Sequence, residues 1–194
     1  MLETDVKKIV FSSTCATYGN PTYLPIDERH PQSPVNPYGH SKLFVENILR
    51  DLHASDDLEV IMLRYFNVAG ADPDLEVGEW HEPETHLIPN ALLVAKGLKS
   101  HLDIYGHNLP TRDGTCIRDF VHVHDLSGAH LKALDLLVSG QTKFDYINIG
   151  TGQGYTVKEV IESVELVTKS KIRTELRPHR PEDPPVLVAS FDKA

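Results

Sequence analysis

A tyrosine and a lysine four residues apart, Tyr38 and Lys42, form the most suggestive pair of reactive side chains in this sequence. They open a segment, residues 38–54, in which apolar residues recur at helical spacing, so both side chains would lie on one helix face, one turn apart. A free tyrosine has a pKa of about 10 and is a poor base at neutral pH. A neighbouring ammonium favours the phenolate, which could then take a proton from a hydroxyl group.

Three consecutive hydroxyl side chains, Ser12, Ser13 and Thr14, add to this interpretation. They end a run, residues 7–13, that is typical of a buried parallel strand, and a second apolar strand is predicted at 58–68. Strand, helix and strand in this order predict a right-handed βαβ crossover and a parallel sheet. Because ligands of such sheets bind at the carboxyl ends of the strands, we expect the hydroxyl groups to face a ligand crevice.

The remaining periodicity predicts an α/β fold. We expect helices within 87–98 and 125–140, the second ended by Gly140, a short strand at 116–123 and a third strand of the sheet at 144–150. Residues 71–110 mix proline and acidic residues and are interpreted as an insertion outside the sheet.

A glycine run, Gly150, Gly152 and Gly154, stands between a predicted strand and a helix, where a dinucleotide could bind. The spacing G-x-G-x-G differs from the dinucleotide fingerprint G-x-G-x-x-G. A tight turn explains the glycines without a ligand, and Thr156 with Glu159 would form a capping box on the next helix. We therefore expect no cofactor at this turn.

Composition limits the classes of function. The 194 residues carry a formal net charge of -9, which disfavours nonspecific nucleic-acid binding. There is no apolar run long enough for a membrane span and no signal-peptide pattern, so we expect a cytosolic protein. The two cysteines, Cys15 and Cys116, favour neither a disulfide framework nor a thiolate site. His122 and His124 alternate, but no familiar metal motif surrounds them, so we expect no metal.

Five motifs, in this order, carry a specific resemblance: FSSTCATYG, NPYGHSK, LRYFNVAGADP, DGTCIRDFVHVHDL and NIGTGQGYTV. Together they resemble the extended short-chain dehydrogenase/reductase family, and most closely its UDP-glucose (UDP-galactose) 4-epimerases. The resemblance covers essentially the whole chain. It implies that residues 1–70 are the remainder of an NAD-binding Rossmann domain. Residues 71–194 would be mainly a smaller α/β substrate domain, with 144–150 returning to the Rossmann sheet.

The resemblance also implies roles for individual residues. Tyr38 would be the catalytic base, Lys42 would hold the nicotinamide ribose of NAD and tune Tyr38, and Thr14 would be the active-site hydroxyl. Tyr65, Ser12 and Ser13 would border the cofactor. The residues implied to bind the UDP-sugar are Asn67, His86, Leu87, Asp103, Tyr105, Arg118, Arg180 and Asp183.

The implied reaction is oxidation of the sugar at C4 to a ketone, followed by reduction on the other face. The related dehydratases place acidic residues beside the active-site threonine, and Thr14-Cys15-Ala16 offers none, which favours an epimerase. The same residues leave open an epimerase acting on a UDP-pentose. Leu187 falls where the family limits bulk at the sugar C2 substituent and leaves N-acetyl sugars undecided. The complete family member is expected to be a homodimer.

The sequence departs from the family in one respect, because it contains no G-x-x-G-x-x-G fingerprint. By the resemblance, that fingerprint belongs to Rossmann sequence ahead of residues 7–13. We therefore expect a piece of an epimerase, shortened at both ends and inactive alone because the adenosine half of the cofactor site is absent. The alternative is a non-catalytic fragment that at most binds a UDP-sugar.

Overall fold

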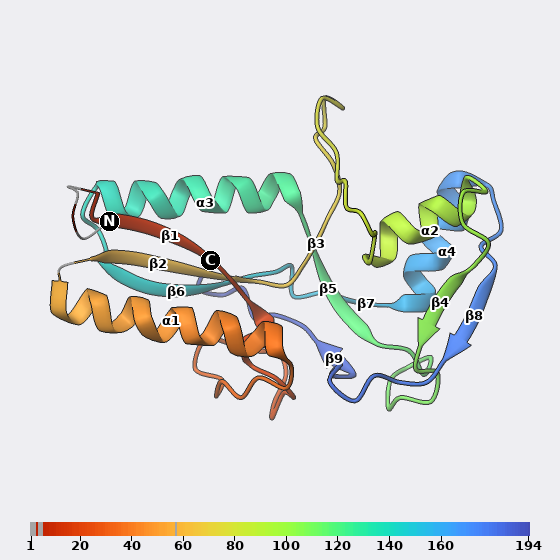
Figure 1. The fold of residues 1–194 in the computed structure, drawn as a ribbon, viewed down its shortest axis with the longest axis horizontal. Coiled ribbons are helices and arrows are strands. Elements are labelled where there is room, and N and C mark those ends of the chain that lie inside the picture. The colour runs from red at the N-terminus through yellow and green to blue at the C-terminus, as the bar shows by residue number, and fades with distance from the viewer. Residues whose placement is uncertain (1–2, 4–5, 57) are drawn as a thin grey trace.

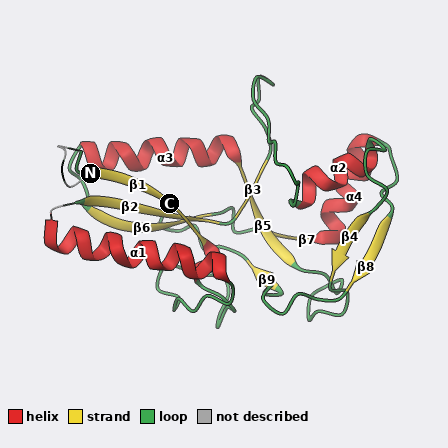
Figure 2. Cartoon of the chain, viewed as in Figure 1, coloured by secondary structure: helices red, strands yellow, loops and turns green. Residues whose placement is uncertain are grey.

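The computed structural model describes residue 3 and residues 6–56 and 58–194 (Figures 1 and 2). Strands and helices alternate along most of it. The strands are β1 Lys8–Thr14, β2 Glu59–Tyr65, β3 Asn67–Ala69, β4 Leu102–Tyr105, β5 Ile117–His122, β6 Phe144–Ile149, β7 Gly154–Thr156, β8 Thr174–Arg177 and β9 Val186–Leu187. The helices are α1 Pro37–Asp56, α2 Leu87–Ala95, α3 Val123–Val138 and α4 Val157–Thr168, with a 3-10 turn at Cys15–Thr17.

The main sheet is three-stranded and parallel, in the order β1-β2-β6, with α1 on one face and α3 on the other (Figure 1). The central strand β2 shows why these residues form a buried strand. Val60 and Met62 pack in the core on the α1 side, whereas Ile61 and Leu63 pack in the core on the α3 side. Both faces of β2 are covered, as its continuous apolar run predicts. The expected α/β fold, with a third strand at 144–150, is confirmed.

A second group of strands lies beyond the carboxyl ends of this sheet. Strand β5 is parallel to β3 and β9 and antiparallel to β7. Further along, β4 and β8 form a parallel pair next to α2 and α4, whose apolar faces share one core (Figure 1). The predicted helix at 125–140 is α3, which begins at Val123 and is followed by Gly140 with a φ of 71°.

The glycine run forms the predicted turn. The backbone amides of Thr151 and Gly152 donate to the buried carboxylate of Asp119, at 2.8 and 2.9 Å. These are the donors that a bound phosphate would need, so an internal anion already occupies them. Thr156 and Glu159 form the expected capping box at the start of α4.

A buried ion pair fixes α1 against the sheet. Arg64 on β2 donates to both carboxylate oxygens of Glu46 on α1, through Nε at 3.0 Å and Nη2 at 2.7 Å. Ser13 on β1 donates to the same carboxylate, and Tyr18 accepts from Arg64 Nη1 at 3.0 Å. The network therefore joins α1, β1 and β2, and two of these elements carry candidate site residues: Tyr38 on α1 and Thr14 at the end of β1.

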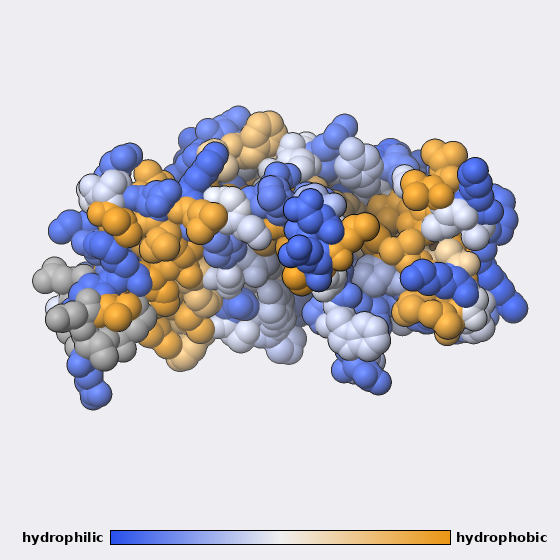
Figure 3. Space-filling view, turned by 90° about the horizontal axis from the view of Figure 1, so that it is seen from above, coloured by the Kyte–Doolittle hydropathy of each residue, from blue (hydrophilic) through white to orange (hydrophobic). Residues whose placement is uncertain are grey.

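Apolar side chains remain exposed on the outer faces of both long helices. On α3, Leu131 is 65% exposed and Val138 is 66% exposed, and on α1 Phe44 is 67% exposed. Figure 3, seen from the α3 side, shows apolar residues on both halves of the molecule with hydrophilic residues between them. Among the helices in the described ranges, none combines the length and the apolar character that a membrane span requires.

Candidate active site

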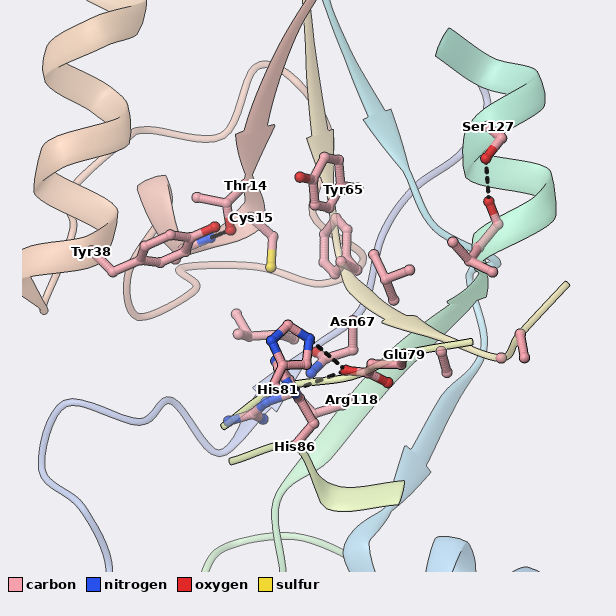
Figure 4. Close-up of a pocket in the computed structure, with 18 of the residues that line it drawn as sticks. Thr14, Cys15, Tyr38, Tyr65, Asn67, Glu79, His81, His86, Arg118 and Ser127 are labelled. Carbon is pink, nitrogen blue, oxygen red and sulfur yellow. Dashed lines mark hydrogen bonds and ion pairs between the residues drawn. The ribbon is translucent and has the colours of Figure 1, made fainter. Parts of the chain in front are cut away.

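A cavity of about 810 Å³ lies where β1 and β2 end. The register of the parallel pair places Thr14 opposite Tyr65, so the last residues of both strands reach the same edge. The lining comes from the segments that follow β1 and β2, the start of α1, the loop before α2, strand β5 and the start of α3. Figure 4 shows two groups of side chains facing each other across it: Thr14, Cys15, Tyr38 and Tyr65 on one side, and Asn67, Glu79, His81, His86 and Arg118 on the other.

Tyr38 points toward Thr14 within this cavity (Figure 4). The approach depends on Gly39, because a Cβ there would lie 2.4 Å from the backbone oxygen of Ala16. Partial burial raises the pKa of Tyr38, and a hydrogen bond with Thr14 opposes this only in part. The phenolate that the sequence predicted is therefore not favoured by the protein alone, and it requires additional positive charge beside the ring.

Lys42 lies beside Tyr38 on α1, as the spacing predicted. Its ammonium is 5.8 Å from the centroid of the Tyr38 ring and donates to the backbone oxygen of Ser12 at 2.9 Å. An ammonium has three donors, and Ser12 takes one of them. Lys42 is thus held at the end of β1, within one helical turn of the tyrosine.

The two serines that precede Thr14 have protein partners. The hydroxyl of Ser12 lies 2.9 Å from Nε2 of His130 on α3, and the buried hydroxyl of Ser13 donates to Glu46 on α1. Alternate residues of a strand face opposite sides of the sheet, so the two hydroxyls contact opposite helices. Neither residue is part of the cavity lining, which begins at Thr14.

Arg118 supplies the positive charge on the opposite wall. The Arg118 side chain is 12% exposed, donates to the backbone oxygen of Ile117 at 2.8 Å and forms an ion pair with Asp183. Asn67 and His86, both predicted to bind substrate, line the same cavity, as does Leu187. A guanidinium with five donors keeps capacity for an anion such as a diphosphate.

Asp183 also lines the cavity, whereas four predicted substrate residues lie outside its lining, near β4: Leu87, Asp103, Tyr105 and Arg180. The guanidinium of Arg180 stacks on the ring of Tyr105, 3.6 Å from its centroid. Asp103 accepts from Arg177 Nε at 2.7 Å, and Leu87 packs against the core shared by α2 and α4. The turn from Arg180 to Asp183 connects this group to Arg118, because the Asp183 amide donates to the Arg180 oxygen at 3.0 Å.

Several lining residues were not predicted. Cys15 lines the cavity beside Thr14, and burial raises its pKa to about 12, so it is a neutral thiol and not a nucleophile. Glu79 and His81 reach the cavity from the loop that the sequence presented as an insertion. Their only signal was the density of charged and imidazole groups between Glu76 and His86, which local periodicity does not interpret.

Comparison with known proteins identifies the class. The profile of the NAD dependent epimerase/dehydratase family matches residues 1–150, and the chain belongs to this family. It is 49% identical over 195 residues to the UDP-glucose 4-epimerase of Halalkalibacterium halodurans, a match that covers all of this chain and 58% of the relative.

Solved structures give the same picture. The structure of UDP-glucose 4-epimerase from Brucella ovis in complex with NAD is 43% identical, with a TM-score of 0.92 over 97% of this chain and 58% of that one. The enzyme from Bifidobacterium longum in complex with NAD+ and UDP is 39% identical, with a TM-score of 0.93 over 98% of this chain and 57% of that one. The chain therefore spans somewhat more than half the length of the relatives it matches.

Proposed function

We propose that this chain carries the catalytic and sugar-nucleotide-binding residues of an NAD-dependent enzyme that inverts C4 of a UDP-hexose. The observation that carries the proposal is one cavity holding a tyrosine directed at a threonine on one wall and an arginine on the other. The first wall can exchange a proton with a sugar hydroxyl, and the second can bind a diphosphate. The names of the related enzymes agree with this combination.

The chain's own part in the reaction is proton transfer and orientation. Tyr38 would take the proton of the 4-hydroxyl while the sugar becomes a 4-keto intermediate, and would return it when C4 is reduced. Thr14, toward which Tyr38 points, would orient both the phenol and the sugar hydroxyl. Because one residue removes and returns the proton, the site needs no second acid.

The residues at the end of β1 fit the nicotinamide end of the cofactor. Lys42 has free donor capacity beside Tyr38, and Tyr65 borders the same cavity, so these two residues would hold the nicotinamide and its ribose. When bound, NAD supplies an acceptor for the hydrogen at C4 and a positively charged ring. That charge would lower the pKa of Tyr38, which burial raises.

The nucleotide would extend from Arg118 toward β4. Arg118 and Asn67 would contact the diphosphate, and the Tyr105 ring with Asp103 would contact the uracil and ribose. Arg180 and Asp183 lie on the turn between these two places, which supports one continuous nucleotide path. His86, at the start of α2, would close the wall over the sugar.

Calorimetric titration with UDP tests this nucleotide path. Arg118→Ala should weaken UDP binding by about 1–3 kcal/mol, the range for a charge-assisted hydrogen bond. Arg50→Ala is the matched control, because Arg50 is exposed on α1 and its side chain bonds locally, to Asn47 at 2.8 Å. Equal affinities of the two variants would remove Arg118 from the nucleotide site.

We also propose that the complete enzyme is a homodimer. The exposed apolar side chains on the outer faces of α1 and α3 support an interface between copies. Phe44→Glu should then shift the molecular mass measured by light scattering from two copies toward one. An equal molecular mass for the wild-type protein and Phe44→Glu would argue against an interface at α1.

A further inference from the structure

Two histidines and a glutamate converge at the cavity wall opposite Tyr38 (Figure 4). Oε1 of Glu79 lies 3.2 Å from Nε2 of His81 and 3.0 Å from Nδ1 of His86. The two imidazole rings are 4.7 Å apart between centroids, and the three donor atoms all lie within 4.8 Å of one another. The loop before α2 thus folds back on itself and presents three ligand atoms at one point.

These separations suit a metal ion. Zinc binds imidazole nitrogen and carboxylate oxygen at about 2.0–2.2 Å, so neighbouring ligand atoms of a tetrahedral site lie about 3.3–3.5 Å apart. Both separations that involve Glu79 are already close to this edge length. The two histidine nitrogens lie within 4.8 Å of each other. A catalytic or regulatory zinc site commonly has three protein ligands and one open position.

The surroundings hold His86 in place. Glu84 Oε1 accepts from the His86 backbone amide at 2.7 Å and lies 2.8 Å from Nδ1, the ring nitrogen that would bind the metal once it carries no proton. The His86 oxygen accepts from the side chain of Asn90, in the first turn of α2, at 2.8 Å. Glu84 also offers a second carboxylate next to the site. The two bonds to the His86 backbone fix the position of this residue beside Glu79.

A comparison within the chain shows what distinguishes this cluster. His101, Asp103 and Glu175 also bring three ligand atoms within 4.8 Å. There, the Arg177 guanidinium donates to both carboxylates, at 2.7 and 3.0 Å, and supplies the positive charge. In the described part of the chain, no lysine or arginine pairs with Glu79 or Glu84 within 4.0 Å. The carboxylates near His86 therefore lack a permanent cation.

We propose that Glu79, His81 and His86 form a binding site for a divalent transition-metal ion of the zinc type. Mixed imidazole and carboxylate ligands suit zinc and cobalt better than magnesium or calcium, which prefer oxygen ligands. The spacing E-x-H-x4-H matches no familiar metal motif, which is why the sequence predicted none. Bound metal would tie the loop at residues 79–81 to the start of α2, along the cavity wall. The proposal does not depend on the reaction that the cavity supports.

The chain contains its own reporter for the test, because its one tryptophan, Trp80, lies between two of the ligands and is 85% exposed. The full chain is titrated with Co²⁺ while Trp80 fluorescence and visible absorption are recorded, and Zn²⁺ is then added as a competitor. We expect saturable quenching with one Co²⁺ per chain, reversed by Zn²⁺. His81→Ala and Glu79→Gln should each weaken binding by about tenfold or more. Both residues are on an exposed loop, so the fold should persist.

The matched control is His101→Ala, in the cluster that Arg177 already neutralises. His101→Ala should leave the Co²⁺ affinity, as measured by the quenching of Trp80 fluorescence, unchanged. The proposal is overturned if neither His81→Ala nor Glu79→Gln weakens the quenching, if His101→Ala weakens it equally, or if Co²⁺ causes no saturable quenching.

Discussion

Removal of one partner from the buried Glu46–Arg64 ion pair, which lies beneath the active site, should lower the free energy of unfolding. The Arg64 side chain is 2% exposed and the Glu46 side chain is completely buried. Arg64→Met keeps most of the apolar stem but leaves the Glu46 carboxylate buried without a cation. Breaking a buried ion pair in this way costs about 3–5 kcal/mol, against a total stability of about 5–15 kcal/mol for a typical domain.

The double variant Arg64→Met/Glu46→Leu sharpens the prediction. Replacing both charges by apolar groups removes the uncompensated carboxylate, so the main remaining cost is that the buried hydroxyl of Ser13 and the side-chain amide of Gln32 lose their acceptor. That cost is about 1–3 kcal/mol. The double variant should therefore be more stable than Arg64→Met, although it carries one substitution more. Arg50→Met, on the exposed face of α1, should change stability by less than about 0.5 kcal/mol.

The pH dependence gives an independent check. Burial acts to raise the pKa of Glu46, but the hydrogen bonds and charge of Arg64, together with hydrogen bonds from Ser13 and Gln32, outweigh it, so the pKa is lowered overall. The carboxylate therefore stabilises the native protein above the unfolded pKa of about 4.3, and this contribution is lost as the pH falls through the lowered native pKa. In Arg64→Met, only the hydrogen bonds from Ser13 and Gln32 oppose burial, so the pKa of Glu46 rises and protonation relieves the cost as the pH falls.

Urea denaturation at several pH values between 7 and 4 measures these differences. The gap in unfolding free energy between the wild-type protein and Arg64→Met should be largest at pH 7 and should narrow toward pH 4. A gap below about 1 kcal/mol at pH 7 would refute the reasoning, since it is less than a typical unsatisfied buried group costs. A gap that does not change with pH, or a double variant less stable than the single one, would refute it as well.

Three further substitutions test the site and its support. Tyr38→Phe, made in this chain joined to the part of the Halalkalibacterium halodurans relative that the match leaves uncovered, should lower epimerase turnover by roughly 10²–10⁴-fold and leave UDP affinity unchanged, because only proton transfer is lost; undiminished turnover would exclude Tyr38 as the base. Gly39→Ala places a Cβ 2.4 Å from the Ala16 oxygen, so thermal unfolding should show a loss of about 1–3 kcal/mol, and an unchanged melting temperature would contradict the close approach. Thr156→Ala removes the cap of α4 and should lower the unfolding free energy measured in urea by about 1 kcal/mol. An unchanged midpoint of urea denaturation would show that the capping box contributes nothing to stability.

The sequence predicted those parts of the site that regular elements position. Tyr38 and Thr14 could be placed together because the ends of parallel strands and the start of the following helix meet at one edge. The positions of Glu79 and His81 could not be predicted from the sequence, because only the tertiary fold brings their loop to the cavity wall. The Glu46–Arg64 pair was missed for a different reason. A charged residue within a helix pattern or a strand pattern resembles a solvated surface group until its partner on another element is known.

Local sequence patterns also did not predict that β4 pairs with β8. Both strands have four residues, and charged or aromatic residues alternate with the apolar ones. The strands are parallel and far apart in the sequence, so no turn signal connects them. The cluster of Asp103, Tyr105 and Arg180 was implied by the family resemblance, whereas its separation from the cavity lining could be seen only in the structure.

Conversion of UDP-galactose labelled with deuterium at sugar C4 tests the central claim most directly. The protein to assay joins this chain to the part of the Halalkalibacterium halodurans relative that the match leaves uncovered, with NAD added and UDP binding checked first by calorimetry. We predict that NMR shows UDP-glucose with the deuterium retained at C4, because the same hydrogen leaves and returns on opposite faces. A protein that binds UDP and NAD but leaves UDP-galactose unchanged, or that yields UDP-glucose with solvent hydrogen at C4, would contradict the account.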